Sequence, residues 1–356
     1  MKIALQNNRS VKSSELAIKK AEGQLQQARS IGGLKLSGNM TQTRIDDVPS
    51  ANFGGQTIEM GKKDIQKIWG EFTQPLYLGG KDRAAVNSAR LGRVIAESAH
   101  TLTRQQIVMA ASLRYYSWLY AREVEDVGKM DLELAQAHYE LVDKRFAAEQ
   151  TSKYEVLRAE VRLAQNRSAY IKDCNDTQLA RLDLLKLLSL PLDLEIKTAC
   201  RLEVEKMQPE LAADMAEVVN RREDLQIKRR ESKIADEQIR AARGEKKPVA
   251  ALFAQYGSED PSSRADFGKL ERQTYWLAGV SLNLPIMDSG FGSGKLSEAR
   301  AAKSQSENEY LNSLEQAQLE ISQAYLTLNS SEQIVVAQKE NLKQAEETMR
   351  LANVRY

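Results

Sequence analysis

The chain has 356 residues, 42% of them apolar and 28% charged, which is the composition of a folded protein and excludes a largely disordered one. Its 51 basic and 49 acidic residues are interspersed and leave a net charge of +2, which argues against nucleic acid as the main partner. Two cysteines are too few for a disulfide framework, and no run of about eighteen apolar residues predicts a membrane-spanning helix. No apolar signal segment follows Met1, so we expect either a cytoplasmic protein or one whose signal segment is not part of this chain.

The first part of the chain predicts a helix followed by a β-hairpin. Apolar residues recur at helical spacing over 11–30, and Gly32-Gly33 ends this helix. Apolar and polar residues then alternate over 34–41, which is typical of a strand with one apolar face. A second alternating run ends at Pro75, with Ile68, Gly70, Phe72 and Gln74 on one side. The polar loop between the two runs contains a proline and three glycines (Pro49, Gly54, Gly55 and Gly61).

A very long helix follows this hairpin. Between Asp82 and about Ala148 there is no proline, and residues that favour helices dominate. At about 1.5 Å per residue this helix would be roughly 100 Å long, and such helices usually pack as coiled coils. The helix breaks over 149–152, where Thr151 or Ser152 predicts the N-cap of a second helix, which ends at Leu190-Pro191. The linking segment 190–220 is expected to hold a short strand at Leu192-Leu194-Ile196 and a helix over 209–220.

The second part of the chain repeats this order. We expect a helix over 223–243, a strand over 249–255, a loop opened by Tyr256-Gly257 and Pro261, and a strand over 277–284. A second long helix then runs over about 292–356.

The two parts also share sequence, which indicates an internal duplication. The run from Pro75 to Gly80 matches the run from Pro285 to Gly290, and positions 75–146 share 13 identities over 72 positions with 285–356. About four identities would arise by chance, so we interpret the chain as two structural repeats, 1–189 and 221–356, joined by the linker 190–220. The residue that matches Phe146 is Tyr356, because the spacing is 210. We therefore expect the second repeat to lack its last helix and the chain to be a piece of a longer subunit.

The predicted strands require partners outside the chain. Four strands cannot close on themselves, whereas three copies supply twelve strands, an even number suited to an outer-membrane β-barrel. The helices would then extend below as a tube. The residues expected at the strand-to-helix junctions are Pro75, Gly79, Gly80, Pro285 and Gly290, because proline ends a ladder and glycine permits a sharp turn. Trp69, Tyr275 and Trp276 could lie at a membrane interface, although packing in the core of a soluble sheet would also explain them.

In this order and spacing, the chain resembles the TolC-like family of outer-membrane efflux and secretion channels. The resemblance is carried by five groups of residues along the chain: Ala4 to Asn8, Gln74-Pro75-Leu76 with Gly79-Gly80, Arg221 to Leu225, Leu284-Pro285-Ile286 with Asp288 and Gly290, and Glu320-Ile321 with Ala324-Tyr325. It implies a homotrimer in the lipid of the bacterial outer membrane, with a twelve-stranded β-barrel and a long α-helical tunnel in the periplasm. It also implies a periplasmic adaptor protein and an inner-membrane transporter as partners.

The same resemblance places an adaptor-contact tip between the two helices of the first repeat. The residues at this position are Arg145, Phe146, Thr151 and Ser152. The family usually has Gly-Leu after the arginine, whereas this chain has Phe146 there.

No pattern of residues predicts catalysis, a metal site or a cofactor site. The two histidines are 38 positions apart, and the glycine-rich run 290–294 lacks the Lys-Ser/Thr of a phosphate-binding loop. The sequence therefore predicts a passive exit duct for small molecules or for type I protein secretion, with no enzymatic activity. The alternative is a soluble coiled-coil scaffold with a small sheet.

Overall fold

The computed structural model describes residues 1–48, 50–59, 63–196, 217, 219–259 and 272–355. Within them the chain forms two compact units, which we describe separately. One unit comprises residues 19–95 and 225–319 and contains the sheet. The other comprises residues 1–18, 96–224 and 320–356. Each unit takes residues from both predicted repeats, so the division into 1–189, 190–220 and 221–356 stays a prediction.

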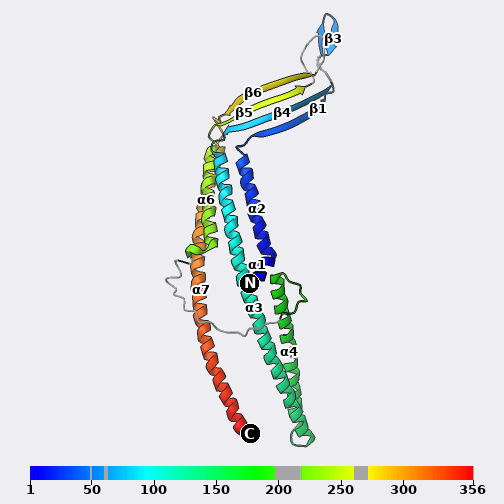
Figure 1. Ribbon diagram of the computed structural model, residues 1–356, viewed down its shortest axis with the longest axis vertical. Coiled ribbons are helices and arrows are strands. Elements are labelled where there is room, and N and C mark those ends of the chain that lie inside the picture. The colour runs from blue at the N-terminus through cyan, green and yellow to red at the C-terminus, as the bar shows by residue number, and fades with distance from the viewer. Residues whose placement is uncertain (49, 60–62, 197–216, 218, 260–271, 356) are drawn as a thin grey trace. The chain divides into compact units, whose positions relative to one another are not determined.

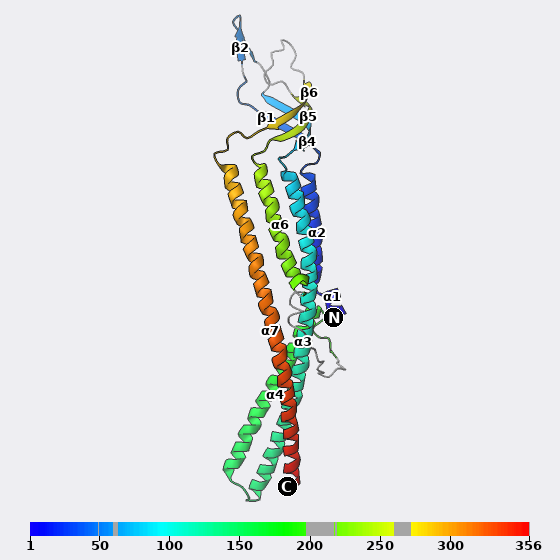
Figure 2. The same cartoon turned by 90° about the vertical axis from the view of Figure 1, so that its left-hand side faces the viewer.

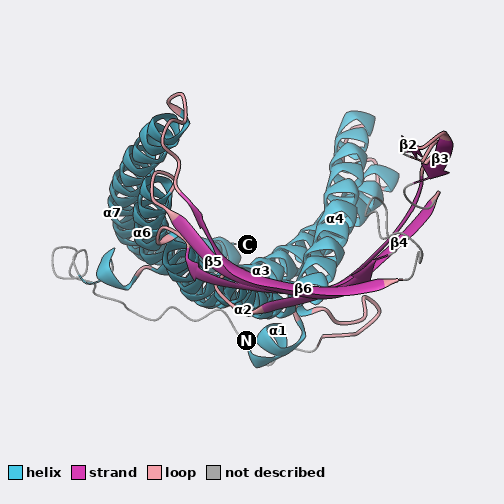
Figure 3. Cartoon of the chain, turned by 90° about the horizontal axis from the view of Figure 1, so that it is seen from above, coloured by secondary structure: helices cyan, strands magenta, loops and turns pink. Residues whose placement is uncertain are grey.

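The sheet has four antiparallel strands in the order β1-β4-β5-β6 (Figure 1). They are β1 (Lys35–Arg44), β4 (Asp64–Tyr77), β5 (Val249–Glu259) and β6 (Gln273–Asn283). The two predicted hairpins are confirmed, and β4 pairs with β5 to join them into one sheet. Figure 3 shows that the strands of this sheet are curved along their length.

Four helices leave the same end of this sheet (Figure 2). They are α2 (Arg9–Ser30), α3 (Lys81–Ala147), α6 (Glu223–Gly244) and α7 (Phe291–Arg355). The duplication reappears in their bounds, because α2 and α6 begin 214 residues apart (223 − 9) and also end 214 apart (244 − 30). The long helices α3 and α7 begin 210 residues apart (291 − 81), which is the spacing of the sequence repeat.

The other unit packs around two small apolar clusters. It contains α1 (Lys2–Asn7), much of α3, and α4 (Lys153–Leu188), which starts and ends where the sequence predicts. One cluster is formed by Ala4, Ala111 and Leu187, and the other by Trp118, Leu119 and Leu184. Alanine at these contacts lets helices approach closely, as expected for coiled-coil-like packing.

Three details of the sequence prediction are wrong or incomplete. The loop between β1 and β4 holds an extra hairpin, β2 (Ser50–Phe53) and β3 (Gln56–Glu59), whose two-residue turn is formed by Gly54 and Gly55 with φ of 60° and 91°. Tyr256 and Gly257 do not open a loop, since β5 continues to Glu259 with every residue paired to β6.

The predicted strand at Leu192-Leu194-Ile196 is also wrong. The amide of Leu194 donates to the carbonyl of Pro191 in a turn, and Arg181 donates to the carbonyl of Leu194 at 2.9 Å. These bonds use the backbone groups that a strand would need, and Ile196 packs against the Trp118 cluster instead. Most of the predicted helix over 209–220 lies outside the described residues.

Candidate functional site

The sheet has one apolar face that extends across all four strands. The side chains at alternate positions are brought into line by the register, in which Leu36 faces Phe72 and Tyr256 faces Trp276. Large apolar side chains of this face are exposed by 37–79%, and they are Leu36, Met40, Ile68, Leu252, Tyr256, Trp276, Val280 and Leu282. A contiguous apolar surface of this kind indicates contact with a membrane or another protein.

The opposite face is more polar. It carries polar or charged side chains on every strand, among them Ser37, Lys67, Gln255 and Ser281, beside apolar ones such as Phe253 and Leu277. Lys67 forms an ion pair with Glu259 at 3.3 Å, directly across the β4–β5 ladder. A sheet that is apolar on one face and polar on the other is what a channel wall requires, with lipid on one side and water on the other.

The three aromatic residues predicted at a membrane interface lie on different faces. Trp276 is 76% exposed on the apolar face and lies opposite Tyr256, which the sequence analysis missed. Trp69 and Tyr275 flank Gly257 on the polar face, where the ammonium of Lys67 lies 5.3 Å and 5.2 Å from their ring centroids. This placement favours Trp276 and Tyr256 as interface residues over Trp69 and Tyr275. The even spacing of Leu252, Ala254 and Tyr256 is the signal that could have revealed Tyr256.

The strand-to-helix junctions have the same backbone conformation in both halves. Gly79 and Gly80 have φ of 68° and 85°, and their equivalents Ser289 and Gly290 have φ of 50° and 91°. Pro75 lies inside β4 at an irregularity of the β4–β5 register, between Pro75 and Tyr77, and Pro285 lies just after β6. The role of these residues in redirecting the chain stays a prediction, which the repeated positive φ values support.

Glu245 connects the two junctions. Its carboxylate accepts from the ammonium of Lys81 at 3.1 Å and from that of Lys295 at 2.9 Å. It therefore joins the first turn of α3 and the second turn of α7 to the end of α6. The hydrogen bonds from Lys295 and Lys81 lower the pKa of the Glu245 carboxyl. No local pattern could have revealed this contact, because the three residues are distant in sequence.

A second acidic residue stabilises the start of α7. The carboxylate of Asp288 accepts from the amide of Gly292 at 2.8 Å and from that of Gly290 at 3.1 Å. These bonds lower the pKa of the Asp288 carboxyl. The turn that leads into α7 is therefore held by a side chain, whereas the equivalent position in the first half is Leu78.

The predicted adaptor-contact tip is the turn between α3 and α4. Glu149 has φ of 59°, and the amide of Gln150 donates to the carbonyl of Arg145 at 2.8 Å. Ser152, one of the two residues predicted as the N-cap, is the N-cap of α4 and accepts from the amide of Glu155 at 3.4 Å. Phe146 is 37% exposed, with the ammonium of Lys153 5.5 Å from its ring centroid. Adaptor contact by Arg145, Phe146, Thr151 and Ser152 stays a prediction.

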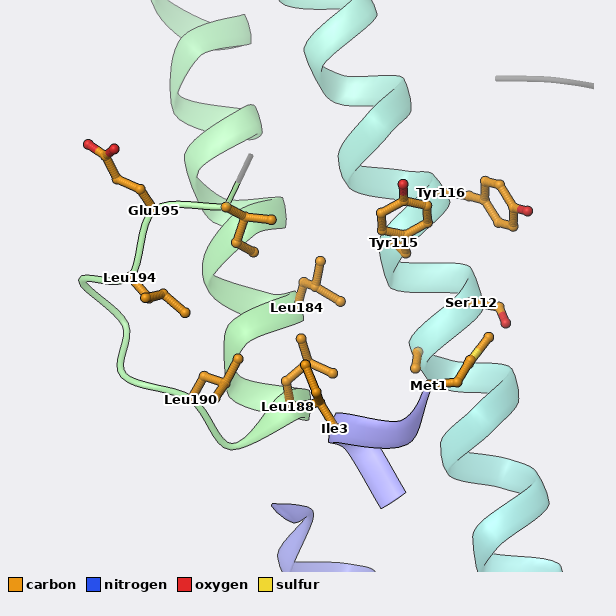
Figure 4. Close-up of a pocket in the computed structure, with 12 residues that line it drawn as sticks. Met1, Ile3, Ser112, Tyr115, Tyr116, Leu184, Leu188, Leu190, Leu194 and Glu195 are labelled. Carbon is orange, nitrogen blue, oxygen red and sulfur yellow. The ribbon is translucent and has the colours of Figure 1, made fainter. Parts of the chain in front are cut away.

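An apolar cleft of 580 Å³ lies between α3, α4 and the segment that follows α4. Figure 4 shows Leu184 and Leu188 on α4 and Tyr115 on α3 around it, with the carboxylate of Glu195 pointing away. The other polar side chains of this lining are the hydroxyls of Ser112, Tyr115 and Tyr116. In the part of the chain that the structure describes, no cluster of His, Cys, Asp or Glu could hold a metal ion. No described helix is both long enough and apolar enough to cross a membrane.

The two-faced sheet and the long helices define a subunit of an outer-membrane channel. The chain belongs to the outer membrane efflux protein family, whose model matches residues 1–189 and 215–356. It is 23% identical to the probable efflux pump outer membrane protein TtgC of Pseudomonas putida, over 99% of this chain and 72% of that protein.

The fold is also that of solved membrane proteins. A membrane protein from Pseudomonas aeruginosa has a TM-score of 0.82 and 21% identity, over 100% of this chain and 82% of that one. The outer membrane protein VceC of Vibrio cholerae has a TM-score of 0.77 and 21% identity, over 100% of this chain and 84% of that one. The TolC-like resemblance and the fold class are therefore confirmed, and the chain is a subunit of an efflux channel that acts as a passive exit duct.

Proposed function

We propose that three copies of this chain assemble into the exit duct of an outer-membrane efflux pump. The observation that supports this best is the four-stranded sheet, with one apolar face and with β1 and β6 each paired on one side only among the described strands. Unpaired strand edges must be covered, and they cannot be left open in lipid. Three sheets placed edge to edge give a closed sheet of twelve strands with no edge.

The faces of such an assembly match the membrane and the duct. The apolar face with Trp276 and Tyr256 would be turned to lipid, and the polar face with Lys67 and Glu259 to the water-filled passage. Helices α2, α3, α6 and α7 would continue the passage on one side of the membrane. A soluble coiled-coil scaffold would have no reason to expose eight large apolar side chains on one sheet face.

The partners follow from the kind of machine to which the relatives belong. An exit duct moves solutes only when another component supplies energy, so we propose an inner-membrane transporter and a periplasmic adaptor that contacts the tip at Arg145–Ser152. The name of TtgC, an efflux pump protein, favours small molecules over proteins as the transported class. We propose no reaction and no cofactor for this chain.

Fractionation of cells and the oligomeric state in detergent test this proposal together. We expect the protein in the outer-membrane fraction and, after mild extraction, as a trimer by native mass spectrometry. A companion assay measures export of a fluorescent solute in cells that lack their own exit duct. Recovery of the protein as a water-soluble monomer would contradict the proposal and favour the scaffold.

A further inference from the structure

The loop after β6 exposes two adjacent apolar side chains. Ile286 is 93% exposed and Met287 is 88% exposed, more than any other large apolar side chain among the described residues. The loop that carries them is held in shape, because Asp288 accepts from the amides of Gly290 and Gly292. The backbone that carries these two side chains therefore has a defined conformation. Exposure of this degree predicts a partner surface.

A second exposed apolar group lies at the opposite edge of the same sheet. Ile31 and Leu34, which are 40% and 58% exposed, lie between α2 and β1. They lie within the four residues that precede β1, as Ile286 and Met287 lie within the four residues that follow β6. Each edge strand of the sheet thus has an apolar pair beside it, at the end where the helices begin.

The direction of the strands brings these two pairs together between copies. Each neighbouring pair in the sheet is antiparallel, so β6 is antiparallel to β1. A second copy that continues the sheet with its β1 against β6 would set its Lys35 beside Asn283. The residues that precede β1 in that copy then lie beside the residues that follow β6.

The faces of the two strands agree with this placement. Leu282, Val280 and Trp276 lie on the apolar face of β6, and Leu36 and Met40 lie on that of β1. Setting Lys35 opposite Asn283 places Leu36 opposite Leu282, which keeps the apolar face continuous from one copy to the next. A shift of this pairing by one residue would place the apolar side chains of one strand on the polar face of the sheet.

We propose that Ile286 and Met287 of one copy pack against Ile31 and Leu34 of the next copy, and that this contact sets the register of the joint between β6 and β1. The proposal rests on the trimer of the proposed function and adds which residues meet in it. A second copy fits this surface better than lipid does, because the loop continues an edge strand whose backbone groups need a partner. The contact is heterologous, so it can close a ring.

Disulfide trapping tests the contact in the whole chain, in outer membranes. Both native cysteines are first replaced (Cys174→Ser and Cys200→Ser), and Ile31→Cys is combined with Met287→Cys, because the register that sets Lys35 opposite Asn283 continues to Ile31 opposite Met287. Because both positions are exposed within one copy, the substitutions should not disturb folding. Mild oxidation should give a ladder of dimer and trimer that a reductant collapses. Neither single variant should form the ladder, because a heterologous contact does not bring two identical residues together.

The matched control moves one cysteine along the same edge. Met40 is 61% exposed on β1, where the same register sets it opposite Ala278, nine positions before Met287 and about 30 Å away along an extended chain. Met40→Cys combined with Met287→Cys should therefore remain uncrosslinked. A trimer by native mass spectrometry without crosslinking of the Ile31 pair, or with equal crosslinking of the Met40 pair, would overturn this contact and leave the proposed function standing. A protein that is monomeric in the membrane would refute both.

Discussion

Gly79 and Gly80 allow the junction geometry to be tested with two neighbouring substitutions. Both residues have positive φ, of 68° and 85°, so alanine at either position must adopt a left-handed backbone conformation. The surroundings differ sharply. A Cβ atom at Gly79 would lie 2.6 Å from the carbonyl oxygen of Gly244 and 3.2 Å from Cβ of Lys247, whereas at Gly80 nothing lies within 4 Å. Gly80→Ala is therefore the matched control for Gly79→Ala.

The two costs can be estimated separately. The left-handed conformation costs alanine about 1–2 kcal/mol, and this cost applies to both variants. A distance of 2.6 Å to a backbone oxygen cannot be relieved by rotating a side chain, so the end of α6 must move. Forcing extra volume into a packed site costs about 1–3 kcal/mol. We expect Gly80→Ala to lose about 1–2 kcal/mol of unfolding free energy and Gly79→Ala about 2–5 kcal/mol.

Denaturant unfolding of the two variants, followed by circular dichroism under the same detergent conditions, measures the difference. The free energy of unfolding of each variant is extrapolated linearly to zero denaturant and compared with that of the unsubstituted protein. If Gly79→Ala and Gly80→Ala lowered the free energy of unfolding equally, the close approach of Gly79 to Gly244 would make no contribution to it. A destabilised Gly80→Ala with an unaffected Gly79→Ala would contradict the reasoning altogether.

Three further predictions concern side chains. Because Lys295 and Lys81 lower the pKa of the Glu245 carboxyl, its stabilising contribution should be fully present above the unfolded-state pKa of about 4.3 and be lost as the pH falls through the lower folded-state pKa. Glu245→Gln should thus lower the melting temperature at pH 7 but scarcely at pH 3, and an effect independent of pH would argue against the ion pairs. Arg222 donates two hydrogen bonds to the carboxylate of Asp224, and lysine would keep the charge but not this paired geometry. Arg222→Lys should therefore lower the free energy of unfolding in denaturant by about 1–2 kcal/mol. In single-tryptophan proteins in vesicles, brominated acyl chains should quench Trp276 but not Trp69, and quenching of Trp69 alone would reverse the assignment of the two faces.

Most of the fold could be predicted because it depends on local patterns. Helix α3 ends before the polar run 149–152, and α4 ends just before Leu190-Pro191. The sequence limits the N-cap of α4 to Thr151 or Ser152, and the structure has Ser152. The alternation in β1 and β4 indicated one apolar face, which the structure shows. The same alternation already separated Trp69 from Ile68 and Phe72, so its place on the polar face could have been read from its position.

The remaining features depend on contacts between distant residues. Apolar and polar residues alternate from Leu192 to Ile196 as they would in a strand. However, Arg181 donates a hydrogen bond to the carbonyl of Leu194, and Ile196 packs against the Trp118 cluster. The ion pairs of Glu245 join residues 164 and 50 positions apart, and no spacing in the sequence indicates them. The extra hairpin at Gly54-Gly55 is different, since two glycines between short alternating runs are a local hairpin signal, which the prediction of a polar loop overlooks.

The two junctions show how the same geometry can arise from different chemistry. At position 79 the backbone takes a positive φ because glycine has no Cβ, and the absence of that atom also lets the chain approach Gly244. At the equivalent position 289 a serine takes a similar φ, which is unfavourable for a residue with a side chain. The cost is offset by Asp288, which holds the amides of Gly290 and Gly292. Because the strand-to-helix turn is retained although the residues differ, the turn itself is the constrained feature, as expected if α3 and α7 must leave the sheet in equivalent ways to line one passage.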